Sequence, residues 1–305
     1  MSPASTDRSA GRLDSALTAL LAQACSTVGV DPRGARPIRL GENAVIGLPD
    51  RIVVRIARPG QIGAATREVQ LARWLADRDV PAIRPIDGIE QPVLVDGRAV
   101  TFWHELPPHG QGTPAQVAEA LRRLHRLPVP RGFALAPLAP FVRLADRIED
   151  ATTLCDDDRT WLHHHLTSLK ARYADLPDGR PHCVIHGDAW VGNVAATADG
   201  QVFWLDLERC SIGPPEWDLI NTTLRFTSFG WITAEDYRDF CRRYGFDVTT
   251  WPGFTLLRDI RELRMTCYIA QQAAEDHTAR AEASLRVACL RGARGPRPWS
   301  WTPAP

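Results

Sequence analysis

The sequence contains almost no lysine. Lys170 is the only lysine among its 36 basic residues, so arginine carries nearly all of the positive charge. Wherever the protein needs a strong cation away from residue 170, arginine must supply it. The planar, always charged guanidinium is not interchangeable with an ammonium group.

Long apolar runs, a net charge and paired cysteines are also missing. No stretch approaches the about 18 apolar residues of a membrane-spanning helix, and the N-terminus has no basic segment leading into an apolar one. The formal net charge is zero, so no global field recruits nucleic acid or a membrane surface. The seven cysteines are scattered without a C-x-x-C pair, which favours reduced thiols over disulfides or a zinc site. We therefore expect a cytoplasmic protein without nucleic-acid or membrane partners.

The most informative stretch is an apolar run that ends in His186-Gly187-Asp188 and is followed by Asn193. A second apolar run ends in Asp206. Phosphoryl transfer needs a carboxylate that orients and deprotonates the attacking hydroxyl, and an amide and a second carboxylate that hold magnesium against the nucleotide phosphates. Asp188 fits the first role, and Asn193 and Asp206 fit the metal roles. A lone His-Gly-Asp is a common turn, but the complete pattern is far more specific.

The two predicted metal ligands are separated by a hairpin signal. Residues 194–196 and 202–205 are apolar strands on either side of an Asp199-Gly200 turn, which is a typical hairpin connection. The hairpin would bring Asn193 and Asp206 together at its open end.

Here the sequence resembles the aminoglycoside phosphotransferases and related small-molecule kinases, whose catalytic stretch reads H-G-D-x-x-x-x-N and is followed by a metal-binding Asp. The resemblance implies an α+β, bilobal, protein-kinase-like fold with a small β-rich N-lobe (1–104) and a larger, mostly helical C-lobe (105–305). It also implies ATP or GTP and Mg²⁺. One departure is Pro214, which replaces the first Asp of the family's G-D-P. Asp218 is retained, and we expect it to cap a helix and bond the catalytic loop backbone.

Strands predicted at 37–40, 45–48 and 51–57 match the nucleotide-covering part of this fold. Gly41 and Asn43 lie in the loop between the first two, where the resemblance implies contact with the nucleotide. Arg55 falls on the third strand, at the position of the phosphate-binding cation. Glu68 lies in a predicted helix at 63–78, at the position of the carboxylate that pairs with this cation. The alternative is that Arg55 and Glu68 are ordinary solvated residues.

A second hairpin signal surrounds Asp96-Gly97 and leads through Phe102 to His104. By the resemblance, this segment joins the lobes and its backbone reads the adenine edge, so Phe102 and His104 are counted with the nucleotide-binding residues. The predicted lobe boundary falls near residue 105.

These residues predict a magnesium-dependent kinase of a small-molecule hydroxyl, with an aminoglycoside-like antibiotic or amino sugar as the leading acceptor and antibiotic resistance as the associated role. Alternatives are a neutral sugar, an amino alcohol or another natural product as acceptor, and a non-catalytic kinase-like binding module. A polycationic acceptor calls for clustered carboxylates in the C-lobe. The candidates in the sequence are Asp156-Asp157-Asp158, Glu208, Glu216, Glu235-Asp236 and Glu275-Asp276.

Overall fold

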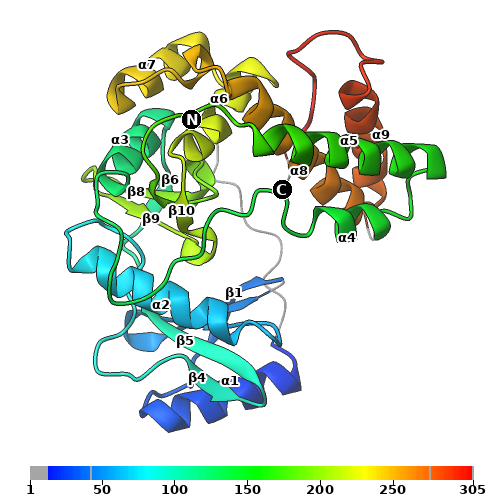
Figure 1. Ribbon diagram of the computed structural model, residues 1–305. Helices are drawn as coiled ribbons and strands as arrows, with labels where there is room; N and C mark the ends of the chain where they lie inside the picture. Colours follow the sequence, from blue (N-terminus) through cyan, green and yellow to red (C-terminus); the bar gives the residue numbers. More distant parts are fainter. Residues whose placement is uncertain (1–12, 42, 275, 304–305) are drawn as a thin grey trace. The chain divides into compact units, whose positions relative to one another are not determined.

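The computed structural model describes residues 13–41, 43–274 and 276–303. These residues form two compact units, each of which gathers separate pieces of the chain. The first unit consists of the residues up to Gly112, Pro130–Leu135 and Gly192–Arg209. The second consists of Thr113–Val129, Ala136–Val191 and the residues from Cys210 onward. Figure 1 colours the chain along its sequence.

A five-stranded antiparallel sheet forms the centre of the first unit. The strands lie in the order β1-β2-β3-β5-β4. Val95 opposes Arg98 across a two-residue turn in which Asp96 and Gly97 have φ of 47° and 73°, so the predicted Asp-Gly hairpin is confirmed. The strand bounds are β1 (Arg36–Leu40), β2 (Ala44–Leu48), β3 (Ile52–Ile56), β4 (Val93–Val95) and β5 (Arg98–His104).

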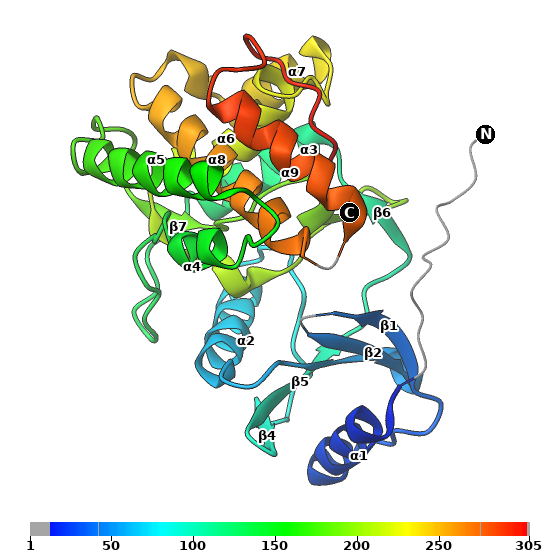
Figure 2. The same cartoon turned by 90° about the vertical axis from the view of Figure 1, so that its right-hand side faces the viewer.

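Helices accompany both faces of this sheet. α1 (Ser15–Val28) packs its buried leucines with Val54, Ile56 and Phe102 in the main apolar core. Since side chains alternate along a strand, Arg55 points to the other face. There it meets α2 (Ile62–Ala76), which lies alongside β5 in Figures 1 and 2.

A smaller sheet in the order β6-β8-β9 completes the first unit. β6 (His109–Gln111) pairs with β8 (Val194–Thr197), which in turn pairs with β9 (Val202–Trp204). The sequence predicted the β8-β9 hairpin but not β6, whose three residues carry no apolar pattern. The division into an N-lobe (1–104) and a C-lobe (105–305) stays a prediction. In the structure, residues 105–112 and 192–209 belong to the first unit. β6 pairs with β8, and Trp204 at the end of β9 exchanges backbone hydrogen bonds with Pro81 and Ile83.

The second unit is mostly helical. α8 is central to one group, in which α4, α5, α6 and α9 all contact it, and α3 packs closely on α7. In Figures 1 and 2, α5, α8 and α9 lie side by side. The helix bounds are α3 (Pro114–Leu124), α4 (Leu144–Glu149), α5 (Asp156–Ala174), α6 (Glu216–Thr227), α7 (Ala234–Tyr244), α8 (Phe254–Gln272) and α9 (His277–Leu290).

Two short strands of the second unit hold the catalytic stretch. β7 (Cys183–Ile185) is fully buried and pairs antiparallel with β10 (Ser211–Gly213). Together the two units confirm the predicted α+β class, with a sheet-rich N-terminal region and a mostly helical remainder. No helix in the described part of the chain is long and apolar enough to cross a bilayer.

Some helix ends follow local signals, and one prediction needs correction. Thr113 and Thr233 form capping boxes at α3 and α7, as side chains of this kind do at helix N-termini. The expectation that Asp218 caps a helix is wrong, because the N-cap of α6 is Pro215 and Asp218 lies inside the first turn. Its carboxylate is directed elsewhere, to the catalytic stretch.

Candidate active site

Arg55 and Glu68 form a buried ion pair in the first unit. Nη1 of Arg55 lies 2.8 Å from Oε1 and 2.7 Å from Oε2 of Glu68. The side chain of Glu68 is only 3% exposed and that of Arg55 only 19% exposed. The predicted pairing is confirmed, and the alternative of two solvated residues is excluded.

Glu208 is a second partner of Arg55 that sequence reasoning did not assign to it. Its Oε2 accepts a hydrogen bond of 2.8 Å from Nη2 of Arg55. Glu208 lies on a short 3₁₀ turn, Leu207–Arg209, directly after Asp206. The only sequence signal for this contact is the position of Glu208 two residues beyond the predicted metal ligand. From the sequence we expected Glu208 among the carboxylates for the acceptor.

The charged groups around Arg55 include more carboxylates than guanidinium groups. Burial raises the pKa of Glu68 to about 7, although the guanidinium of Arg55 opposes the shift. Burial by itself would lower the pKa of Arg55, but Glu68, Asp206 and Glu208 outweigh it and raise that pKa. Three carboxylates surrounding one guanidinium create a region that attracts a further cation.

Asn43 lies beside this ion pair. It lines an open cleft together with Arg55, Gln61, Glu68 and Glu208. Its Oδ1 accepts a 3.3 Å hydrogen bond from the backbone N–H of Arg58. Gly41 directly follows β1 in the connection to β2. It precedes Glu42, which lies outside the described residues. The cleft thus combines a carboxamide, a guanidinium and carboxylates.

Phe102 and His104 occupy β5, and their backbone N–H groups are already engaged. The N–H of Phe102 donates to Oε1 of Gln91 at 2.7 Å, and its side chain is fully buried. The N–H of His104 donates to the carbonyl of Arg84 at 2.8 Å, and that of Glu105 to the carbonyl of Arg51 at 2.7 Å. Any contact of this segment with a nucleotide base must therefore use groups other than these three donors.

Asn193 and Asp206 stand at the open end of the β8-β9 hairpin. Val194 opposes Trp204, and the N–H of Leu205 donates to the carbonyl of Asn193 at 2.9 Å. Asn193 is 9% exposed, whereas Asp206 is exposed and has a left-handed φ of 48°. The hairpin that was expected to bring the two residues together is confirmed.

The oxygen chemistry of this pair fits Mg²⁺. Carboxylate and carboxamide oxygens are suitable ligands for this ion, which is usually bound by one or two protein carboxylates together with substrate phosphates and waters. Among residues 13–41, 43–274 and 276–303, no group of three or more His, Cys, Asp or Glu side chains forms a metal cage. A magnesium ion at this hairpin would therefore take the rest of its coordination from phosphate oxygens and waters.

Asp188 belongs to the second unit and sits on a tight turn after β7. Gly187 has a φ of 81°, a conformation that favours glycine. Oδ2 of the fully buried Asp218 accepts from the N–H of His186 at 2.7 Å, and its Oδ1 accepts from the N–H of Gly187 at 2.8 Å. The expected bond between Asp218 and the catalytic loop backbone is confirmed.

His125 also contributes to this support. Its Nε2 lies 3.0 Å from Oδ2 of Asp218, and its Nδ1 lies 2.9 Å from the hydroxyl of Tyr244. Burial alone would raise the pKa of Asp218, but these hydrogen bonds and the neighbouring histidines prevail and lower it. Asp218 is thus held as a buried carboxylate whose hydrogen bonds orient the turn before Asp188.

Arginines approach Asp188 from two helices. Arg261 of α8 donates from Nη2 to the carbonyl of Gly187 at 2.7 Å, and its Nη1 lies 3.7 Å from Oδ1 of Asp188. Its guanidinium lies 4.1 Å from the centre of the Trp217 ring. Arg225 of α6 lies 4.7 Å from the centre of the Trp190 ring. Neither arginine was assigned a role from the sequence, since both are far from Asp188 along the chain.

The family of the chain follows from comparison with known proteins. The model of the phosphotransferase enzyme family matches residues 36–258, a span that includes the Arg55 ion pair, the hairpin and the Asp188 turn. The chain belongs to this family, and the protein is an enzyme of the phosphotransferase class. A search of curated protein sequences finds no match.

Solved structures agree on the fold. An aminoglycoside phosphotransferase from Streptomyces rimosus is 22% identical, with a TM-score of 0.62 over 80% of this chain and 97% of its own. The amicoumacin kinase hAmiN, solved with AMP-PNP and Ca²⁺, is 16% identical, with a TM-score of 0.64 over 86% and 87%. The choline kinase LicA from Streptococcus pneumoniae is 15% identical, with a TM-score of 0.61 over 88% and 97%. At these identities the likeness shows the fold.

Proposed function

We propose that the protein transfers the γ-phosphoryl group of ATP or GTP to a hydroxyl group of a small molecule in a magnesium-dependent reaction. The observation that carries this proposal is the Asp188 turn. Its glycine has the required left-handed backbone, and buried Asp218 bonds both N–H groups that precede Asp188. Asp188 itself remains 37% exposed, so an acceptor can reach it.

Asp188 acts as the general base. One of its carboxylate oxygens accepts the proton of the acceptor hydroxyl as the hydroxyl oxygen forms a bond to the γ-phosphorus. The bond between the γ-phosphorus and the oxygen that bridges to the β-phosphate breaks, and the nucleoside diphosphate leaves with that oxygen. Asn193 and Asp206 would hold Mg²⁺, which neutralises charge on the phosphate oxygens when bound.

Arg55 serves the nucleotide phosphates, and Glu68 positions it. A guanidinium held by a bidentate carboxylate on one side has a fixed orientation for its remaining N–H groups. Gly41 and Asn43 would contact the phosphates from the β1-β2 loop. His104 would border the base. Phe102, whose side chain is fully buried and whose N–H and carbonyl are engaged, would support this segment from within the sheet.

For the acceptor, the fold neighbours support two classes. An aminoglycoside-like antibiotic or amino sugar is supported by the Streptomyces rimosus enzyme and by a neighbour solved with ADP and spectinomycin, and would fit a role in antibiotic resistance. The second class comprises neutral sugars, amino alcohols and other natural products. Choline and ethanolamine kinases among the neighbours support the amino alcohols, and the amicoumacin kinase supports other natural products. These classes differ in charge, so the charged residues around Asp188 bear on the choice between them.

The test is a screen for acceptor-dependent release of ADP or GDP over aminoglycosides, other hydroxylated antibiotics, sugars, amino alcohols and hydroxy acids, with and without Mg²⁺. We expect at least one acceptor to be phosphorylated by the wild type and not by Asp188→Asn. If the protein binds Mg-nucleotide but phosphorylates nothing in a broad panel, the catalytic proposal fails and a nucleotide-binding module takes its place.

A further inference from the structure

The surroundings of Asp188 carry positive charge. Arg261 lies 3.7 Å from its carboxylate. Asp188 is also close enough to act electrostatically on Arg225. One carboxylate thus faces two guanidinium groups within the second unit, an arrangement that attracts an anion and repels an acceptor bearing several ammonium groups.

Arg225 differs from three other arginines of this unit that stack on tryptophan. Arg286, Arg291 and Arg297 each lie over a tryptophan ring and also pair with a carboxylate. The guanidinium of Arg225 lies 4.7 Å from the Trp190 ring centre and 5.4 Å from that of Trp231. Among the described residues it has no ion pair.

The position of Arg225 is fixed by its neighbours. The N–H of Trp231 donates to the backbone carbonyl of Arg225 at 2.6 Å. The indole N–H of Trp231 donates to the carbonyl of Trp301 at 2.8 Å, which anchors this ring to the C-terminal segment. Trp190 follows Asp188 by two residues, so the ring beneath the guanidinium is part of the catalytic turn. Partial burial lowers the pKa of Arg225, and a bound anion would offset that cost.

Most of the carboxylates that were candidates for a polycationic acceptor already have a partner within the protein. Asp157 and Asp158 bind Arg291, Asp156 binds Arg159, and Glu216 accepts from the N–H of Arg180. Asp236 and Asp276 cap α7 and α9. Glu235 is exposed at the start of α7, Glu208 is bound to Arg55 in the first unit, and Glu275 lies outside the described residues.

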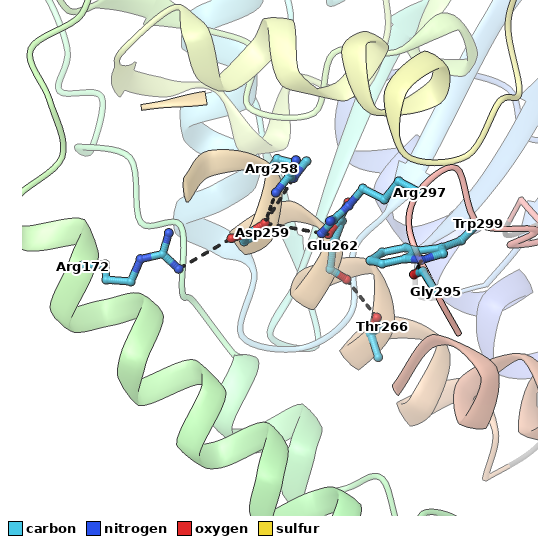
Figure 3. Close-up of polar contacts among 8 residues, drawn as sticks. All are labelled: Arg172, Arg258, Asp259, Glu262, Thr266, Gly295, Arg297 and Trp299. Atoms are coloured by element: carbon cyan, nitrogen blue, oxygen red, sulfur yellow. Dashed lines mark hydrogen bonds and ion pairs between the residues drawn. The ribbon is translucent and has the colours of Figure 1, made fainter. Parts of the chain in front are cut away.

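Two acidic residues of α8 are engaged in the same way. Figure 3 shows Asp259 among Arg172, Arg258 and Arg297, with Glu262 next to it. Nε of Arg297 donates to Oε1 of the fully buried Glu262 at 2.8 Å, and Nη2 donates to Oε2 at 2.6 Å. To use Asp259 or Glu262, an ammonium-rich acceptor would have to compete with the arginines that bind them.

Building on the proposed kinase reaction, we propose that the acceptor carries an acidic group, a carboxylate or a phosphate or sulfate ester, and that Arg225 binds this group while the acceptor hydroxyl meets Asp188. The guanidinium can offer two parallel N–H groups to two acidic oxygens. The rings of Trp190 and Trp231 hold it and exclude water on their side. The acceptor is thus a hydroxy acid or an acidic sugar derivative rather than an aminoglycoside.

The experiment compares acceptors that differ only in charge. One set is D-glucuronate, D-glucose and D-glucosamine, and a wider set pairs hydroxylated natural-product acids with their primary amides. Streptomycin represents the polycations. We expect the acidic member of a pair to exceed its amide by about 10- to 100-fold in kcat/KM, the range of an ionic hydrogen bond. Its KM should rise with ionic strength.

Variants then assign this preference to Arg225. Arg225→Gln should remove the preference for the acid, and Arg225→Lys should keep part of it, with the KM for the nucleotide unchanged in both. Arg238→Gln is the matched control, because Arg238 is exposed on the neighbouring helix α7 and bonds only the carbonyl of Ala234 among the described residues. Thermal melts check folding, and the comparison of acid with amide in the wild type needs no variant.

Each other outcome overturns the inference. If neutral or cationic acceptors are preferred, the acidic acceptor is wrong while the kinase stands. If Arg225→Gln raises the KM for ATP instead, Arg225 binds nucleotide phosphate. If no acceptor of any charge shows turnover that depends on Asp188, the proposed kinase reaction itself fails, and the acceptor inference with it.

Discussion

Arg55 in the first unit and Asp188 in the second have opposite surroundings. Arg55 is one cation bound by Glu68 and Glu208, with Asp206 acting on it as well. Asp188 is one anion approached by Arg261 and acting on Arg225. The first group has an excess of negative charge that suits a metal ion, and the second has an excess of positive charge that suits an anionic ligand. The two charge groups therefore call for different partners.

The buried carboxylates that hold Arg55 and the Asp188 turn in place have pKa values shifted in opposite directions. Glu68 and Asp218 are both buried carboxylates, but the pKa of Glu68 is raised and that of Asp218 is lowered. Glu68 faces other carboxylates as well as Arg55, whereas Asp218 accepts two backbone N–H bonds and faces histidines. Neighbouring charges and hydrogen-bond donors, together with burial, set the direction in which the pKa of each buried carboxylate moves.

The largest expected effect comes from removing the base of the second group. Asp188→Asn keeps the shape of the side chain but cannot take the proton of the hydroxyl, so kcat should fall by about 100- to 10,000-fold. Affinity for Mg-nucleotide, measured by calorimetry, should stay within about twofold of the wild type. Near-normal turnover in a folded variant would show that Asp188 is not the base.

The second effect tests the metal ligand of the first group. Asp206→Ala removes one of two oxygen ligands, so Mg-dependent nucleotide binding and transfer should both fall by about 100-fold or more. Asp199→Ala, at the turn end of the same hairpin, is the control and should retain both. Equal magnesium dependence in the two variants would remove Asp206 from the metal site.

The third effect concerns the cation of the first group. Arg55→Met should raise the nucleotide KM and lower kcat, by about 10- to 100-fold in kcat/KM, while Arg55→Lys should keep substantial activity because charge matters more than shape. Arg33→Met, an exposed residue paired only with Asp31 in the described structure, serves as the control in steady-state assays. A fully active Arg55→Met would indicate that Arg39, Arg51 or Arg58 binds the nucleotide phosphates instead.

The fourth effect appears in stability at acid pH. A carboxyl group whose pKa is lowered by folding stabilises the protein above its unfolded pKa of about 4 and loses this contribution as pH falls through the folded value. Asp218→Asn should therefore lower the free energy of unfolding, measured by urea melts at pH 7, by roughly 3 kcal/mol for a broken buried pair. It should also flatten the decline of that free energy below about pH 4. If the variant lost stability at acid pH as steeply as the wild type, Asp218 would not be the charged group that we infer.

The smallest effect is expected at Glu68. Because its folded pKa is raised to about 7, its contribution to stability is complete below the unfolded value near 4.3 and declines as pH rises toward 7. Urea melts in EDTA should show the wild type losing on the order of 1 kcal/mol between pH 5 and 8 that Glu68→Gln does not lose. The variant should also show a milder fall in activity than Arg55→Met, and an equal fall would mean that Glu68 does more than position Arg55.

The sequence alone determined the features that depend on neighbouring residues. Asp96-Gly97 and Asp199-Gly200 specify hairpins because their backbone suits tight turns, and Thr113 and Thr233 specify helix starts by bonding the free N–H groups there. The spacing of Asp188, Asn193 and Asp206 indicated the reaction class for the same reason, since the three lie within one short stretch of chain.

Only the tertiary structure decided which distant residues meet. Glu208 binds Arg55 across 153 positions, Arg261 bonds Gly187 across 74, and Arg225 stacks on Trp190 from a helix that the sequence analysis did not delimit. β6 and β10 are only three residues long, and each is stabilised by hydrogen bonds to a partner strand, β8 and β7 respectively. No local pattern encodes such contacts, because they depend on how buried faces pack, and charge at a site is the sum of what packing brings there.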